Sequence, residues 1–271
     1  MLKQSHIHLL IEHLRQLKRD GVTQVNYEDS SLDALYEAAL RAHKTMPDPI
    51  FPDLVTPPQV GLPPVPDKAF LFNVLRAQIQ TNQTIAKHVH PGCQFVLGRG
   101  NLNAPICIVG EAPGSEEEKA GLPFVGPAGK LLTKFLSEVG LDDSYVFITN
   151  IMLWRPEMET TTGNRPPTTQ EMNFCLPYCK AQLDIVKPAC IIALGSTAVN
   201  GLLGVNKQRR ITQIRGTWDT YNNIPLIPTY HPSYLLRSGS KELNHQFITD
   251  LISAKQKARL PIHPHETSLY T

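Results

Sequence analysis

Short runs of apolar residues alternate along this chain with longer stretches in which apolar residues recur every three or four positions. The first pattern is typical of a buried β-strand, and the second of an α-helix that packs one face against a core. Strands are predicted at 105–109, 145–149, 190–194 and 226–228, and helices at 128–139, 168–186, 196–203 and 240–259. This alternation predicts a three-layer α/β/α fold, in which helices cover both faces of a mainly parallel central sheet.

The N-terminal part of the chain follows a different pattern. Apolar positions have helical spacing in residues 6–19 and 31–42, whereas residues 45–66 are crowded with prolines and are expected to form an extended linker. A helix is predicted next at 67–87, and a short strand at 94–97. The predicted organisation is an N-terminal helical extension (1–44), a linker (45–66), an α/β domain (67–262) and a C-terminal tail (263–271).

Composition narrows the possible classes of protein. The 271 residues carry a formal net charge of only +2, so any contact with nucleic acid must come from local clusters of charge. The five cysteines are odd in number and lack CxxC spacing, which argues against a disulfide framework. No apolar run approaches the ~20 residues that span a bilayer, and the N-terminus is too polar for a signal peptide. We expect a monomeric, cytoplasmic protein without a membrane partner.

Three segments with chemically useful side chains each follow a predicted strand: 110–129, Asn150 and 231–237. The carboxyl ends of parallel strands meet at one edge of the sheet, which is where open α/β sheets bind ligands. The first segment is glycine-rich, but its carboxylates occupy the place where a nucleotide-binding loop would hold a phosphate. Carboxylates near an aromatic residue, Phe124, instead indicate a site that stabilises positive charge or orders water beside a base.

Each of these residues also has a simpler explanation. Asn150 can donate and accept hydrogen bonds at once, as reading the edge of a base requires, but an asparagine after a strand can also merely favour a turn. His231 could stabilise a developing anion or could be an ordinary loop histidine. Phe124 could stack on a base or belong to the core. Glu116, Glu117 and Glu118 could be the solvated start of a helix.

In combination, these segments resemble the uracil-DNA glycosylase superfamily, and within it the family 4 type. The similarity covers about residues 75–260, and its blocks follow in the family's order. The matching blocks are Gly110-Glu-Ala-Pro-Gly114, Gly121-Leu-Pro-Phe-Val-Gly126, Thr149-Asn150, Arg155-Pro156, Asn164-Arg-Pro-Pro167, Cys175-Leu-Pro, Leu194-Gly195, Arg215-Gly216 and Tyr230-His-Pro-Ser-Tyr-Leu-Leu-Arg237. The resemblance implies excision of uracil from DNA by hydrolysis of the N-glycosidic bond, as in base excision repair.

The resemblance also implies roles for individual residues. Glu111, Glu117 and His231 are the implied catalytic residues, and the histidine stabilises the departing uracil anion. Phe124 is expected to stack on the extruded uracil, and Asn150 to bond its amide edge and reject cytosine. The other implied substrate-binding residues are Gly110, Ala112, Pro113 and Gly114. The implied DNA-binding residues are Arg155, Arg165, Ser233, Leu235, Leu236 and Arg237, either leucine filling the gap in the base stack.

One feature of the family is incomplete in this sequence. Family 4 enzymes usually hold an iron–sulfur cluster with four cysteines. The first pair would fall near residues 82–86, which contain no cysteine, and the third position is Trp154, so only Cys175 matches. Cys179 lies one helical turn later and cannot complete the set. We therefore predict that the protein has no iron–sulfur cluster and no other cofactor.

Two other functions remain open. The chain could be a damaged-DNA binding module with weak catalysis, although the presence of Glu111, Asn150 and His231 together argues against this. It could also be a glycosylase for another deaminated base, hypoxanthine or xanthine, because their lactam edges resemble that of uracil. The partner of residues 1–44 could be a replication or repair protein.

Overall fold

The computed structural model describes residues 67–86, 88–89, 93–157 and 163–262. The predicted helices at 6–19 and 31–42, the proline-rich linker and the C-terminal tail lie outside these residues. None of the described helices is long and apolar enough to cross a membrane.

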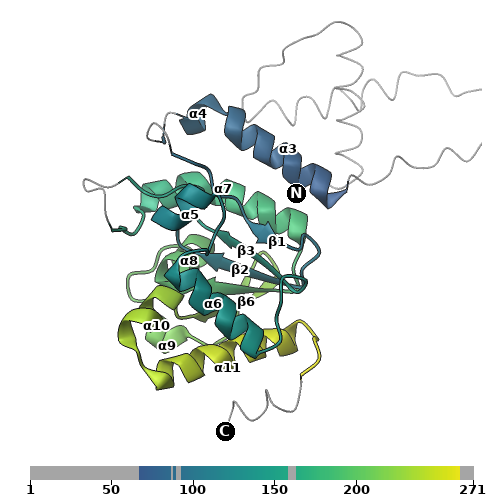
Figure 1. Cartoon of the computed structure of the whole chain (residues 1–271), viewed down its shortest axis with the longest axis vertical. Helices are drawn as coiled ribbons and strands as arrows, with labels where there is room; N and C mark the ends of the chain where they lie inside the picture. Colours follow the sequence, from purple (N-terminus) through teal and green to yellow (C-terminus); the bar gives the residue numbers. More distant parts are fainter. Residues whose placement is uncertain (1–66, 87, 90–92, 158–162, 263–271) are drawn as a thin grey trace, which may run out of the picture. The chain divides into compact units, whose positions relative to one another are not determined.

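A six-stranded sheet forms the centre of the described part of the chain (Figure 1). Its strands are β1 (Arg99–Gly100), β2 (Ile106–Gly110), β3 (Val146–Asn150), β4 (Cys190–Leu194), β5 (Asp219–Tyr221) and β6 (Ile224–Thr229). Their order is β1-β3-β2-β4-β6-β5, with the four central strands parallel and the two edge strands antiparallel. Because Gly110 pairs with Asn150 at the end of the β2–β3 ladder, the carboxyl ends of these strands lie level with each other.

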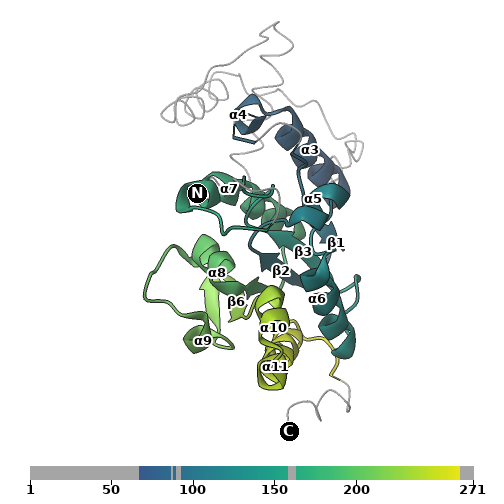
Figure 2. The ribbon, with the colours of Figure 1, turned by 60° about the vertical axis from the view of Figure 1, so that its left-hand side comes forward.

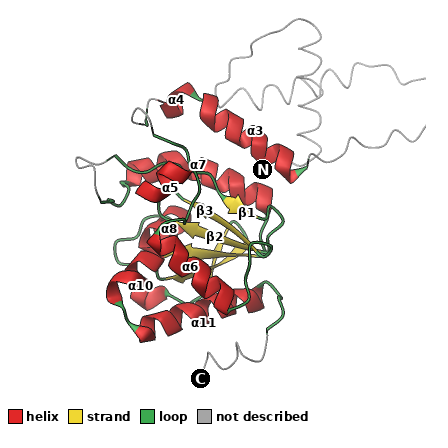
Figure 3. Ribbon diagram, in the orientation of Figure 1, coloured by secondary structure: helices red, strands yellow, loops and turns green. Residues whose placement is uncertain are grey.

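Alternate residues of the central strands point to opposite faces of the sheet. In β2, Cys107 and Val109 belong to one buried apolar cluster, and Ile106 and Ile108 belong to the other. Helices that contribute to the first cluster are α3 (Lys68–Thr81), α4 (Gln83–Ala86), α7 (Thr169–Val186) and α8 (Gly195–Leu203). Helices that contribute to the second are α6 (Pro127–Glu138), α10 (Pro232–Ser238) and α11 (Lys241–Lys257). Figures 2 and 3 show these two helical layers on either side of the strands, which confirms the predicted α/β/α fold.

Local sequence explains where several helices begin. The Thr168 hydroxyl accepts a hydrogen bond from the Glu171 N–H, and the Glu171 carboxylate accepts one from the Thr168 N–H, which is a capping box at the start of α7. Proline occupies the first position of both α6 and α10, where the missing N–H costs nothing. Two further short helices are α5 (Ser115–Ala120) and α9 (Ile211–Ile214).

Two predicted elements differ from the structure. The helix predicted at 67–87 is broken at Asn82, whose side-chain oxygen accepts hydrogen bonds from the Thr84 and Ile85 N–H groups and so caps a second helix. The strand predicted at 94–97 is not part of the sheet. Val96 donates a single backbone hydrogen bond to Leu153, and β1 begins only at Arg99.

Candidate active site

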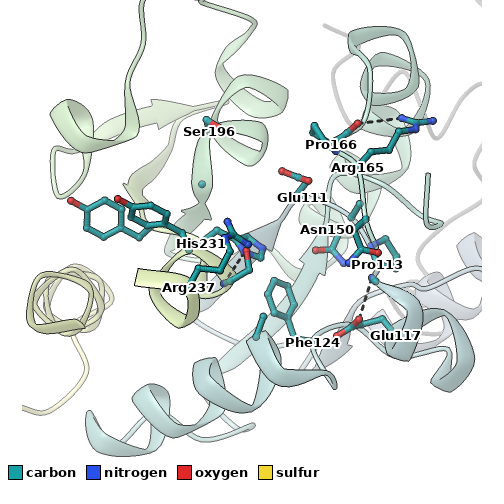
Figure 4. Close-up of a pocket in the computed structure, with 18 of the residues that line it drawn as sticks. Glu111, Pro113, Glu117, Phe124, Asn150, Arg165, Pro166, Ser196, His231 and Arg237 are labelled. Carbon is teal, nitrogen blue, oxygen red and sulfur yellow. Dashed lines mark hydrogen bonds between the residues drawn. The ribbon is translucent and has the colours of Figure 1, made fainter. Parts of the chain in front are cut away.

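A cavity of about 510 Å³ opens at the carboxyl edge of the parallel strands. It lies where the segments after β2, β3, β4 and β6 meet, so the predicted convergence of distant segments is observed. Its lining residues are Glu111, Ala112, Pro113, Gly114, Glu117, Phe124, Ala128, Asn150, Asn164, Arg165, Pro166, Gly195, Ser196, Ile211, Tyr230, His231, Ser233, Tyr234 and Arg237. Figure 4 shows Asn150 facing His231 and Arg237 across this space, with Phe124 and Glu111 between them.

Phe124 forms one wall of the cavity and is only 7% exposed. Its backbone has a φ of 54°, in the left-handed region that non-glycine residues rarely adopt, and such strain clusters at functional sites. Gly110 allows the ring to approach the strand, because a Cβ there would lie 2.5 Å from the phenyl ring and 2.4 Å from Asn150 Oδ1. A Cβ at Gly129 would lie 2.1 Å from the Phe124 backbone. These two glycines therefore fix the ring beside Asn150.

Asn150 is the last residue of β3 and is 2% exposed. Its Oδ1 is buried and has no hydrogen-bond partner within the protein. An unpaired buried acceptor costs ~1–3 kcal/mol, so its presence in a ligand-sized cavity calls for an explanation. The atom is placed to accept a hydrogen bond from a bound molecule.

Glu111 follows β2 and lines the cavity. Its Oε2 accepts a hydrogen bond of 2.5 Å from the Thr197 hydroxyl in the first turn of α8. Burial raises the pKa of the carboxyl group, while the Thr197 hydroxyl and the nearby Arg237 guanidinium lower it. The carboxylate is thus partly desolvated, and its ionised form is supported by one hydrogen bond and one positive charge.

Glu117 also lines the cavity, but its carboxylate is committed to the backbone. Oε1 accepts hydrogen bonds from Val125 N (3.0 Å) and Gly126 N (2.8 Å), and Oε2 accepts one from Gly114 N (3.1 Å). The side chain therefore ties the start of α5 to the residues that immediately follow Phe124. These contacts hold both carboxylate oxygens against the backbone, and the catalytic role expected from the sequence stays a prediction.

His231 is the N-cap of α10, and its backbone and ring are both fixed. The ring Nδ1 accepts a hydrogen bond from Ser233 N at 3.2 Å and lies 2.8 Å from Ser233 Oγ. Burial and, to a smaller extent, the nearby Arg237 together lower the pKa of the imidazole to about 4, while Glu117 opposes this shift. The ring is therefore neutral at physiological pH. Because Nδ1 accepts the N–H of Ser233, the ring hydrogen lies on Nε2.

Two of the three arginines expected to contact DNA, Arg155 and Arg165, are engaged within the protein. The Arg155 side chain is 13% exposed, donates to Asn164 and Gly163, and lies 3.5 Å from a Glu118 carboxylate oxygen. The Arg165 guanidinium forms a bidentate pair with Glu171 at 2.7 and 2.8 Å. Both arginines thus hold the segment between β3 and α7, and of the two only Arg165 lines the cavity.

The DNA contacts expected on α10 divide according to burial. Ser233 and Arg237 line the cavity. Leu235 is only 1% exposed and packs in the second apolar cluster, so its side chain does not reach the surface. Leu236 is 45% exposed at the end of the helix. Of the two leucines expected from the sequence, only Leu236 is available to contact a ligand.

Sequence reasoning missed several residues of the cavity. Gly195, Ser196 and the hydrogen-bonding Thr197 come from the start of α8, directly after β4. The signal was present in the sequence, because β4 was predicted and its carboxyl end must lie at the same edge as those of its neighbours. Tyr230 and Tyr234 also line the cavity, and their ring centroids lie 5.6 Å apart with the rings inclined by 39°.

Comparison with known proteins agrees with this geometry. The family model of the uracil DNA glycosylase superfamily matches residues 97–254. The chain belongs to this superfamily. It is 44% identical over 161 residues to the type-4 uracil-DNA glycosylase of Thermotoga maritima, which covers 59% of this chain and 81% of the relative. It is 39% identical over 164 residues to the type-4 uracil-DNA glycosylase of Pyrobaculum aerophilum, covering 58% and 79%.

A further similar protein has a different name. The chain is 32% identical over 155 residues to a protein named DNA polymerase from Bacillus phage SP01, which covers 57% of this chain and 16% of the relative. The predicted resemblance to the superfamily, and to its family 4 type, is confirmed by the model match and the type-4 relatives.

The prediction that this uracil-DNA glycosylase family member has no cofactor is wrong by the same comparison. Its relatives are type-4 enzymes, and members of that family use an iron–sulfur cluster. Among residues 67–86, 88–89, 93–157 and 163–262, no group of three or more His, Cys, Asp or Glu side chains is placed to hold a metal ion.

Two buried cysteines, Cys175 and Cys179, and Trp154 occupy or adjoin the positions expected for cluster ligands. Burial raises the pKa of Cys175 and of Cys179 to about 12, which disfavours the thiolate that metal binding requires. The Trp154 ring packs against Phe95 and Phe174, with centroids 6.2 and 6.0 Å apart. The donors among the described residues therefore do not fit an iron–sulfur cluster.

Proposed function

We propose that this protein is a uracil-DNA glycosylase that flips uracil out of DNA into the cavity and hydrolyses its N-glycosidic bond. The observation that carries the proposal is the convergence of a buried unpaired acceptor, an aromatic wall and a neutral imidazole on one cavity. Family membership and the names of the type-4 relatives support the same reaction.

Base recognition rests on Asn150 and Phe124. The unpaired Oδ1 of Asn150 accepts a hydrogen bond from uracil N3–H, and the side-chain NH2 donates to uracil O4. Cytosine presents an acceptor at N3 and an amine at C4, so it would leave both partners mismatched, and a buried mismatch of this kind is costly. Phe124 stacks on the flat face of the base, which offsets part of the few kcal/mol needed for flipping.

His231 is proposed to stabilise the departing uracil. As the C1′–N1 bond breaks, its electron pair moves onto the base and negative charge grows at O2. The Nε2–H of the neutral ring donates to that oxygen, and Arg237 adds a positive charge nearby. A donor of this kind acts mainly in the transition state, where it lowers the barrier by about 3 kcal/mol or roughly a hundredfold in rate.

Glu111 is proposed to act on the other side of the scissile bond. Its carboxylate stabilises the positive charge that develops on the sugar and orients the attacking water. The water oxygen bonds to C1′ and passes a proton to the carboxylate, and the uracil anion takes a proton from solvent. Glu117 is proposed to position Phe124 and α5 through its hydrogen bonds to the backbone.

DNA is proposed to dock over the rim that α10 forms. Leu236 is exposed there and fills the space left by the flipped base, while Ser233 and Arg237 face the nucleotide. The protein is further proposed to act as a monomer in the cytoplasm. Residues 1–44 are proposed to bind a replication or repair protein.

Oligonucleotides carrying uracil, hypoxanthine or xanthine test the proposal directly. The expected result is an abasic site, cleavable by alkali, and free uracil from the uracil substrate alone. Asn150→Asp should abolish most of this activity, and Asn103→Asp, an exposed residue outside the cavity, should not. Preferred release of hypoxanthine or xanthine would identify that base, and not uracil, as the substrate. Tight binding of uracil-containing DNA without release would indicate a binding module instead.

A further inference from the structure

Thr197 contacts the Glu111 carboxylate from α8, a helix to which the proposed mechanism assigns no role. Its hydroxyl donates to Glu111 Oε2 at 2.5 Å, although the two residues are 86 positions apart. Thr197 lies in the first turn of α8, and Glu111 lies just beyond β2. A short hydrogen bond to a carboxylate is charge-assisted and about twice as strong as a neutral one.

The backbone of Glu111 is held by hydrogen bonds from the segment that directly follows β3. The Glu111 carbonyl accepts a hydrogen bond from Met152 N at 3.0 Å, and the preceding carbonyl, that of Gly110, accepts one from Ile151 N at 3.0 Å. The backbone is therefore fixed to the continuation of β3. Only the side-chain torsions are left to be set, and the contact with Thr197 sets them.

The hydrogen bond leaves the carboxylate able to bind water. An ionised carboxylate offers about four acceptor positions, and Thr197 uses one of them. Figure 4 shows the Glu111 carboxylate pointing into the cavity, between the α8 side and the Asn150 side. The Thr197 hydroxyl occupies one acceptor position of Glu111 Oε2. It therefore limits the positions at which a water can bind to the carboxylate, without preventing water from binding.

The charged and titratable groups that face Glu111 across the cavity come from several elements. Arg237 and His231 face the cavity from α10, Glu117 from α5, and Arg165 from the segment before α7. Burial raises the pKa of Glu111, and Thr197 is the larger of the two influences that lower it, ahead of Arg237. Removing the hydroxyl should therefore make the carboxyl group harder to ionise.

We propose that Thr197 is a positioning residue that fixes the Glu111 carboxylate in the orientation in which it holds the attacking water. This inference rests on the proposed glycosylase function and adds a residue on α8 to its machinery. Thr197 is not among the residues that line the cavity. It acts through Glu111 alone, so its effect must disappear when Glu111 is absent.

Thr197→Val removes the hydroxyl and keeps the shape of the side chain, whereas Thr197→Ser keeps the hydroxyl. Single-turnover release of uracil should fall about tenfold or more in Thr197→Val and stay within about twofold of wild type in Thr197→Ser. The affinity for uracil-containing DNA should be unchanged in both. Thr249→Val is the matched control, because it removes a partly buried helical hydroxyl in α11 that bonds only the His245 carbonyl.

A double-mutant cycle separates positioning from general destabilisation. In the Glu111→Ala background, adding Thr197→Val should change the rate by less than about twofold. In wild-type background, the acidic limb of the pH–rate profile should move to higher pH in Thr197→Val, because a raised pKa leaves less of the ionised carboxylate. Equal losses in both backgrounds, or a loss in Thr197→Ser as large as in Thr197→Val, would overturn the inference.

A spectroscopic measurement separates this inference from the proposed function. The carboxyl carbon of Glu111 can be followed by 13C NMR during a pH titration and assigned by its disappearance in Glu111→Gln. The pKa of Glu111 should be higher in Thr197→Val than in wild type and Thr197→Ser. A wild-type protein that releases no uracil would defeat the proposed function. An unchanged pKa of Glu111 in Thr197→Val would defeat the role of Thr197, whether or not uracil is released.

Discussion

The rings of Phe124 and His231 lie 5.8 Å apart, centroid to centroid, and are inclined by 34°. Phe124 belongs to the segment between β2 and α6, and His231 caps α10. The packing of α6 against α10 brings the two residues together. We expect a flat base that stacks on Phe124 to lie within reach of the imidazole.

Replacing His231 should slow bond cleavage much more than it weakens binding. In His231→Ala the donor to uracil O2 is lost, and the single-turnover rate should fall at least about a hundredfold. The dissociation constant for uracil-containing DNA should change less than about fivefold, because the donor acts mainly in the transition state. His245→Ala, on α11 and outside the cavity, is the control. Equal changes in rate and affinity would argue against this role.

The same histidine should make the fold less stable in mild acid. Its pKa is about 4 in the folded protein and about 6.5 when unfolded, so between these values the unfolded chain binds more protons. Stability contributed by the neutral ring is therefore present above pH 6.5 and lost as pH falls toward 4. Between pH 6.5 and 4.5 the loss should be about 2 to 3 kcal/mol.

Denaturant unfolding of wild type and His231→Gln at a series of pH values checks this sign. The wild-type protein should lose more stability than the variant as pH falls from 6.5 to 4.5, because glutamine does not titrate. Parallel curves for the two proteins would show that His231 takes up protons at its ordinary pKa in the folded state.

Glu117→Gln should disturb the site through the backbone. The substitution keeps the size of the side chain but places an NH2 group against N–H donors that now face a carboxylate oxygen. Unfolding free energy should fall by about 2 kcal/mol, and uracil release should slow because Phe124 is no longer held. The neighbouring Glu116 is exposed, so Glu116→Gln should change neither quantity. Lost activity with unchanged stability would restore a catalytic role for Glu117.

The sequence was enough to place Phe124, Asn150 and His231 at one edge of the sheet. Each follows a strand with a clear apolar pattern, and parallel strands align their carboxyl ends. The same rule covers β4, yet Thr197 was not recognised, because a threonine in a first helical turn usually has no role beyond the helix. Its contact with Glu111 depends on the side chains of two elements, which no local pattern encodes.

The contacts of the arginines and of Glu117 likewise could not be predicted from the sequence. Arg155 and Arg165 have the charge expected of phosphate contacts, but the structure pairs them with Glu118 and Glu171. Whether an arginine binds DNA or stabilises a loop depends on partners that lie several residues away in the sequence or on another helix or strand. The Leu235–Leu236 pair posed a simpler problem, since α10 has only 7 residues and too few turns to reveal its buried face.

Two adjacent leucines on α10 allow DNA contact to be separated from folding. Leu236 is 45% exposed, so Leu236→Ala should change unfolding free energy by less than about 0.5 kcal/mol. It should nevertheless slow uracil release from double-stranded DNA, where a base must be extruded and the gap filled, more than from single-stranded DNA. Leu235 is 1% exposed, and Leu235→Ala should destabilise the fold by about 2 to 5 kcal/mol with equal effects on both substrates. A selective loss of activity on duplex DNA in Leu235→Ala, or no such loss in Leu236→Ala, would show that a residue other than Leu236 fills the gap left by the flipped base. Among the aromatic residues that line the cavity, Tyr234 is the most exposed.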